Sequence, residues 1–200
     1  MANTDRPAGF VPYGPVLRQG LYAVNTAPTI NICVGDIVVS GGAIVTTPKG
    51  FLQDVLDAAV PASAAANLGA VLSVMDSDGD TVKYLAPSTA GNSTIAGYII
   101  VADHPDQRFI AQEDGATNAI DLSEGGQNAD IICATLCAPN TVTGLSTQEI
   151  DSDSAGTSAG LVLKLLHPHI NDTPADDSDV GCRWVVQINE HYYGDTMAGS

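Results

Sequence analysis

The sequence predicts an all-β protein: a single β-barrel or β-sandwich domain with an extended N-terminal arm and at most one short helix. Three observations carry this prediction. Apolar runs of strand length recur along the chain, turn residues separate them, and the first 28 residues are apolar but interrupted by proline and glycine. Many short strands with turn signals between them are typical of barrels and sandwiches.

The predicted arm covers residues 1–28. Its prolines, the first at Pro7 and the last at Pro28, prevent a continuous strand ladder or helix. The segment is nevertheless too apolar for a solvated tail. An extended arm lying on another surface would explain both properties.

The predicted barrel or sandwich domain covers residues 29–191, and residues 192–200 are a C-terminal tail. Its expected strands are Thr29–Ser40, Leu68–Met75, Thr81–Ala86, Ile95–Ala102, Gln107–Gln112, Ile131–Leu136, Leu161–Leu166 and Arg183–Asn189. Its expected turns are Gly35-Asp36, Gly41-Gly42, Asp78-Gly79, Gly125-Gly126 and the run Asp151–Ser154. In the last strand Trp184, Val186 and Ile188 share one face, which is predicted to be core.

Helical periodicity occurs only at Phe51–Ala59. There Leu52, Val55 and Leu56 share one helical face, and Pro61 would end the helix. This segment is therefore the one short helix that we expect.

The segment Asp76–Asp80 places three carboxylates at alternate positions, as the first half of a calcium-binding EF-hand loop does. Gly79 comes too early for that loop, and Pro87 stands where the bidentate glutamate belongs. Strand-like runs flank an Asp-Gly dipeptide here, which favours the tip of a β-hairpin. The alternative is an incidental cation site.

The charge balance restricts the partners. Seven Lys and Arg against 23 Asp and Glu give a formal net charge of -16, which repels nucleic acid and anionic membranes. The sequence shows neither a secretion signal nor an apolar window of the ~18 residues that a membrane span needs. We expect a protein made and used in water, with no nucleic-acid or membrane partner.

No cofactor or metal site is predicted. The four cysteines are expected to be buried, reduced thiols, because Cys133 and Cys137 on one strand would lie ~13 Å apart, beyond disulfide reach. The pair His167 and His169 suggests a metal only if a third ligand exists; the alternative is a loop with exposed histidines.

No catalytic residue is predicted either. The sequence lacks a nucleophile elbow, a phosphate-binding loop, a dinucleotide fingerprint and a zinc-protease motif. Among 23 carboxylates nothing selects a pair for acid and base catalysis. These observations favour a protein that is not an enzyme over a virion-associated polysaccharide hydrolase.

Several segments resemble the capsid decoration, or cement, proteins of tailed bacteriophages. They are the start Met1–Phe10, then Gly97–Asp106 with Phe109–Asp114, Gln127–Ile131, Thr143–Ser146 and Trp184–His191. The resemblance implies a non-enzymatic, β-rich structural protein on the outer surface of the virion head. It implies binding to the major capsid protein and self-association as a homotrimer. The alternative is a head-fibre or tail component that binds host-surface glycans.

The arm then supplies the candidate partner-binding residues. Phe10, Val11, Tyr13 and Leu17 would anchor it on the capsid or on a neighbouring copy, and Arg6 and Arg18 flank that anchor. The alternative is an arm that folds back on its own domain and covers an edge strand.

Overall fold

The computed structural model describes residues 6–24, 31–56, 67–86, 95–115, 118–133, 140–170, 172 and 181–194. In this part the chain forms fourteen strands and a single turn of 3-10 helix, Leu122–Glu124. The predicted all-β class is confirmed, and a closed barrel is present. No helix of the described part is long and apolar enough to cross a membrane.

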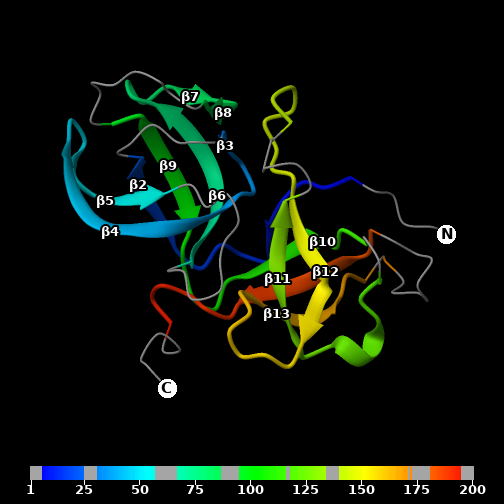
Figure 1. The fold of residues 1–200 in the computed structure, drawn as a ribbon. Coiled ribbons are helices and arrows are strands. Elements are labelled where there is room, and N and C mark those ends of the chain that lie inside the picture. The colour runs from blue at the N-terminus through cyan, green and yellow to red at the C-terminus, as the bar shows by residue number, and fades with distance from the viewer. Residues whose placement is uncertain are drawn as a thin grey trace.

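Five strands close into the barrel (Figure 1). In spatial order they are β4 (Ile37–Thr47), β5 (Gly50–Leu56), β2 (Gln19–Val24), β9 (Gly97–Ala102) and β6 (Asn67–Asp76). Pairing of β6 with β4 closes the ring, and all neighbours are antiparallel except β2 and β5. Apolar side chains from all five strands, such as Tyr22, Val38, Val55, Val71 and Ile99, pack together inside it.

A second sheet of six strands lies beside the barrel; we call it the open sheet. In spatial order its strands are β1 (Val11–Tyr13), β10 (Arg108–Gln112), β14 (Arg183–Ile188), β13 (Leu163–Pro168), β11 (Asn128–Cys133) and β12 (Gln148–Gly156). One face carries a core in which Trp184, Val186 and Ile188 are buried. The prediction that these three side chains face the core is confirmed.

The barrel and the open sheet are joined by buried contacts. The Gln148 side chain in β12 accepts a hydrogen bond from the Ile37 N–H in β4 at 2.6 Å. Ile37, Ala70 and Ala102 of the barrel belong to the same apolar cluster as Trp184. Three small elements complete the fold: β3 (Ile32–Cys33) pairs with β8 (Tyr84–Leu85), and β7 (Thr81–Val82) pairs antiparallel with β6. One apolar cluster therefore spans the junction of the barrel and the open sheet, and a second fills the barrel.

The predicted domain boundaries need correction at both ends. Residues 19–24, assigned to the arm, form β2, which pairs along its whole length with β9 and is buried at Tyr22, Ala23 and Val24. The start of the predicted tail is also docked, since the Tyr192 N–H donates to the Asn67 carbonyl at 2.7 Å. Of the described residues in the predicted arm, 6–18 remain as an extended arm.

The predicted helix is wrong within the described residues, because residues 50–56 form β5; residues 57–59 lie outside them. Strands on both sides of β5 supply backbone partners that outweigh a local helical pattern. Two predicted turns are also strand. Gly41-Gly42 forms a bulge inside β4, and Asp151–Ser154 lies in β12, where the Ser152 hydroxyl donates to Asp114.

The prediction of four reduced cysteines is wrong for Cys133, which is disulfide-bonded. Cys33 and Cys182 are free and buried, as expected. The predicted strand ran to Leu136, whereas β11 ends at Cys133, so the distance argument for an extended strand does not apply. Cys137 lies outside the described residues.

The hairpin prediction for Asp76–Asp80 is confirmed. β6 and β7 pair antiparallel on either side of it, with Val74 opposite Val82. One carboxylate oxygen of Asp76 accepts hydrogen bonds from the N–H groups of Asp78, Gly79 and Asp80, at 3.0, 2.9 and 2.9 Å. The carboxylate therefore serves to hold the turn.

Candidate docking face

The arm lies on its own chain. In Figure 1 it runs through the junction between the open sheet and the barrel, where β1 pairs antiparallel with β10. Val11 is opposite Ile110, and Tyr13 is opposite Arg108. Of the two arrangements that the sequence left open, the structure shows the arm that folds back over an edge strand.

Close packing fixes the arm at Gly9 and Phe10. The Phe10 N–H donates to the Gly35 carbonyl at 2.8 Å, and the ring is only 1% exposed. Gly9 has φ +68°, and a side chain there would lie 2.4 Å from the Cβ of Ser146 and 2.5 Å from the Gly35 oxygen. Phe10 is therefore a core residue, and the prediction that it contacts a partner is wrong.

Arg18 is also engaged within the chain. Its guanidinium pairs with the buried Asp103 at 2.9 Å and lies 4.5 Å from the ring centroid of Tyr193. The Tyr22 hydroxyl donates a short hydrogen bond to the same carboxylate. Burial and that hydrogen bond raise the pKa of Tyr22. Arg18 thus links the arm to the barrel and to the C-terminal segment, while its side chain keeps 44% of its surface in solvent.

The other predicted arm residues are exposed. Val11, Tyr13 and Leu17 keep 48%, 40% and 52% of their surface in solvent, and Arg6 is exposed at the start of the described chain. They remain available for contacts with another molecule.

The exposed side of the open sheet continues this surface. In β10, the exposed Arg108 and the half-buried Ile110 alternate with the buried Phe109 and Ala111, so they point away from the core, whereas Gln112 on the same side is buried. Two rows then cross the sheet through β1, β10, β14 and β13. The first row is Val11, Ile110, Val185 and His167, in which Val185 is fully buried, and the second is Tyr13, Arg108, Gln187 and Lys164.

We call the following set the docking face: Arg6, Val11, Tyr13, Arg108, Ile110, Lys164, His167 and Arg183. The rings of Tyr13 and His167 meet edge to face, with centroids 6.2 Å apart. Four of the seven Lys and Arg residues of the chain belong to this face. A chain of net charge -16 thus carries a mixed basic and apolar surface.

Only one of these four cations has an acidic partner among the described residues. Arg183 forms a bidentate ion pair with Asp172, with N–O distances of 2.8 and 2.9 Å, and the Arg183 hydrogen bond lowers the pKa of the Asp172 carboxyl. No ion pair joins Arg6, Arg108 or Lys164 to any described residue. Their charges are therefore available to a partner.

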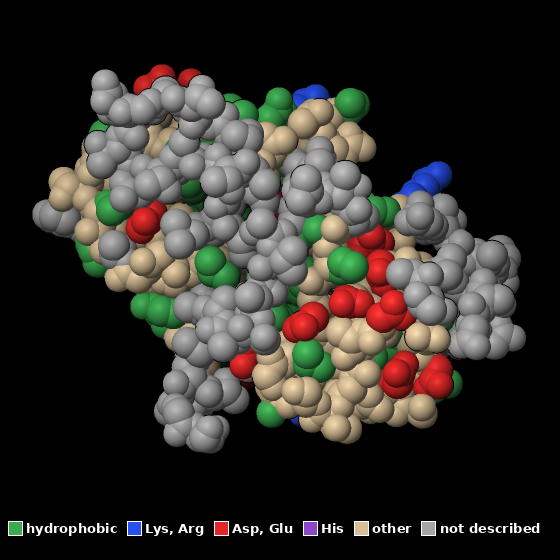
Figure 2. Space-filling model, viewed as in Figure 1, with side chains coloured by type: hydrophobic (Ala, Val, Ile, Leu, Met, Phe, Trp, Pro, Cys, Tyr) green, Lys and Arg blue, Asp and Glu red, His purple; other side chains and the backbone are tan. Residues whose placement is uncertain are grey.

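The outer face of the open sheet is acidic at its other end, over β11 and β12. Asp130 of β11 stands directly opposite Asp151 of β12, and Figure 2 shows Asp and Glu side chains gathered over these strands. Partial burial, and then the neighbouring carboxylate of Asp114, raise the pKa of Asp151. Like charges directly opposite each other are unfavourable, so a cationic neighbour would stabilise this end.

Two further carboxyls are buried inside the fold and perturbed. Burial raises the pKa of Glu113 to about 7, although the carboxyl accepts backbone hydrogen bonds from Ile120 and Cys182. Burial likewise raises the pKa of Asp36 to about 6. Within the described residues no group of three His, Cys, Asp or Glu side chains could hold a metal ion.

Sequence reasoning missed Arg108, Lys164 and Arg183 as members of the face. Arg183 lies opposite the core face of its predicted strand, which indicates an outward position, whereas Lys164 stands in the apolar run Leu161–Leu166, whose weak alternation predicted a strand covered on both sides. The pattern did not reveal that β1, β10, β14 and β13 stand side by side. That adjacency brings together residues more than 150 positions apart.

Comparisons with protein-family models, with curated proteins and with solved structures each found no match to this chain.

Proposed function

We propose that this protein is a non-enzymatic structural component of a tailed-bacteriophage virion, which decorates and cements the head by binding the outer surface of the major capsid protein shell. The observation that supports this most is the docking face. It combines exposed apolar side chains with three cations, Arg6, Arg108 and Lys164, that no described acid neutralises. Such a surface suits a protein partner, because apolar contact supplies affinity and charge complementarity supplies orientation.

The arrangement of the arm also supports a cementing role. The arm is held at Phe10 by the core and at Arg18 by Asp103. Val11, Tyr13 and Leu17 are therefore presented on a rigid support, which reduces the entropy lost on binding. The resemblance of the sequence to capsid decoration proteins points the same way.

We also propose that copies associate with one another, as homotrimers. Besides Val11 and Tyr13, the arm and the adjoining strand expose Val16, Leu17 and Leu21, at 41%, 52% and 37%. Exposed apolar residues grouped in this way are typical of protein interaction sites. Sedimentation equilibrium would test the stoichiometry, and a monomer at 100 μM would refute it.

Binding to shells tests the main proposal directly. Shells assembled from the major capsid protein encoded in the same genome are mixed with the purified protein and sedimented. We expect saturable co-sedimentation, and an increase in the temperature at which the shells dissociate, because a ligand that binds only the assembled state stabilises it. Absence of co-sedimentation at tens of micromolar protein would refute the proposal.

A second candidate function is glycan binding by a head-fibre or tail component. A polar cavity of about 350 Å³ is lined by the amides Gln187 and Asn189 together with Lys164 and His191. Amide and cationic side chains can hydrogen-bond sugar hydroxyls. Binding to a host-surface glycan array by a protein that does not bind shells would favour this function instead.

A further inference from the structure

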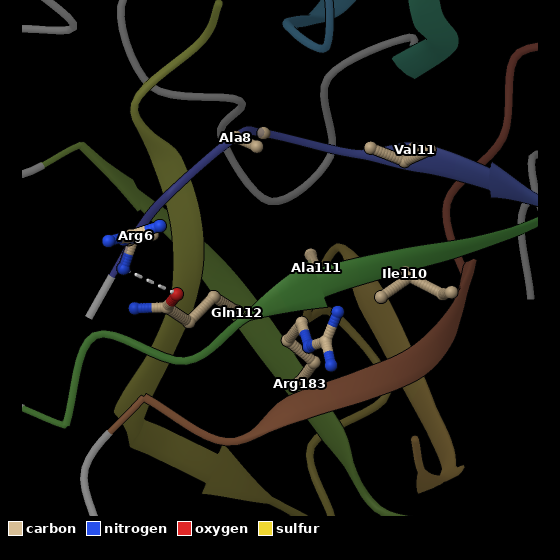
Figure 3. A pocket seen from close by; sticks show the side chains of 8 residues that line it. Arg6, Ala8, Val11, Ile110, Ala111, Gln112 and Arg183 are labelled. Carbon is tan, nitrogen blue, oxygen red and sulfur yellow. Dashed lines mark hydrogen bonds between the residues drawn. The ribbon is translucent and has the colours of Figure 1, made fainter. Parts of the chain in front are cut away.

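A small pocket opens where the arm crosses β10 (Figure 3). Its volume is about 200 Å³, and its apolar lining includes Ala8 and Val11 from the arm and Ile110 and Ala111 from β10. Small-molecule sites usually have volumes of ~300 Å³ or more. The pocket is therefore suited to one or two amino-acid side chains.

Arg6 stands at one end of this pocket, with Val11 and Ile110 toward the other end (Figure 3). The Arg6 N–H donates to the Gln112 side-chain oxygen at 3.0 Å, which holds the backbone of Arg6 at the rim. Arg183 also lines the pocket, but Asp172 neutralises it. Arg6 is therefore the cation that remains for an incoming carboxylate.

The edge of β1 is closed to an added strand. Pro12 has no N–H to donate, and the N–H of Phe10 is already bonded to Gly35. A partner therefore cannot bind here by extending the sheet through successive backbone hydrogen bonds. Recognition must come from side chains that enter the pocket and contact its rim.

We infer that the pocket receives an apolar side chain from a partner protein segment in which an adjacent Asp or Glu pairs with Arg6. The apolar lining selects the first side chain, and Arg6 selects the second. The inference rests on the proposed function, in which this segment belongs to the shell protein.

A peptide titration tests the pocket without shells. The ¹⁵N-labelled protein is titrated with three acetylated and amidated peptides, Gly-Leu-Glu-Gly, Gly-Leu-Gln-Gly and Gly-Leu-Lys-Gly. We expect amide shifts at Val11, Ile110 and Ala111, with the glutamate peptide binding about three-fold tighter than the glutamine peptide, as for an exposed ion pair. In Arg6→Gln this preference should disappear, and Ala8→Leu, which fills the pocket, should abolish the shifts.

Equal binding of the three peptides, shifts located elsewhere or no shifts at all would overturn the inference. Melting temperatures of both variants serve as the folding control. Lys49→Gln, which removes a positive charge from the β4–β5 hairpin of the barrel, controls for net charge.

Shell binding separates this inference from the proposed function. If the wild-type protein binds shells, we expect Ala8→Leu to weaken binding about ten-fold or more, and Lys49→Gln to leave it unchanged. Wild-type binding that Ala8→Leu and Arg6→Gln do not affect would overturn the inference and leave the proposed function intact. Failure of the wild type to bind shells would refute the proposed function, and the peptide titration would still test the pocket on its own. If Arg6→Gln disrupts only self-association, the occupant is a second copy and the inference is wrong.

Discussion

Replacement of Phe10 by alanine tests whether the arm is part of the core. The ring is 1% exposed and belongs to the apolar cluster that contains Phe109 and Trp184. Truncation of a buried phenylalanine costs about 3–5 kcal/mol, through lost transfer free energy and the cavity left behind. In a domain of this size 1 kcal/mol corresponds to about 2–4 °C, so we expect the melting temperature to fall by roughly 6–20 °C.

The assay is urea unfolding followed by tryptophan fluorescence, since Trp184 is the single tryptophan of the chain and is fully buried in the open sheet. The matched control is Val11→Ala on the same arm. Val11 is 48% exposed, so its truncation should cost under about 1 kcal/mol.

Deletion of the arm should also destabilise the protein. A free arm could be deleted over residues 2–18 without loss of stability, whereas the structure predicts a large loss, because Phe10 and the pair between Arg18 and Asp103 go with it. If Phe10→Ala costs no more than Val11→Ala, the arm does not pack in the core in solution and the structural argument fails.

Three further predictions concern single sites. Gly9→Ala should lower the free energy of unfolding by about 2–5 kcal/mol in a chemical unfolding experiment. Gly14 also has a positive φ, but nothing lies within 4 Å of a Cβ added there, so Gly14→Ala should lower it by only about 1 kcal/mol. Equal losses would contradict the close packing at Gly9. Folding raises the pKa of Glu113 from 4.5 to about 7, so the folded state favours the protonated carboxyl. The contribution of Glu113 to the free energy of unfolding is therefore complete below pH 4.5 and is lost as the pH rises through about 7. At about 1.4 kcal/mol per unit, wild type should lose about 3 kcal/mol relative to Glu113→Gln between pH 4 and pH 8, and a pH-independent difference would refute this. A chelator should leave the melting temperature unchanged, since backbone N–H groups occupy the Asp76 carboxylate oxygen; a fall of many degrees would reveal a bound cation.

Much of the strand content could be predicted from the sequence because strand periodicity is a local property. The alternation in Arg183–Ile188 predicts which side chains of that strand face the core, and the structure confirms it. The hairpin at Asp76–Asp80 was likewise predictable, since an Asp-Gly turn between apolar runs has few alternatives. Composition and charge also follow from the sequence alone.

Interactions between distant segments determined the rest. The helical pattern at residues 51–56 gave way to β5 because β4 and β2 offer backbone hydrogen bonds on both sides. Phe10 looked like a free anchor in the sequence, and it became core because Gly35 and β10, far along the chain, receive the arm. The docking face exists only because strand pairing places Val11, Arg108, Arg183 and Lys164 on one surface. Sequence spacing carries no information on such adjacency, since it arises from the pairing energies of the whole sheet.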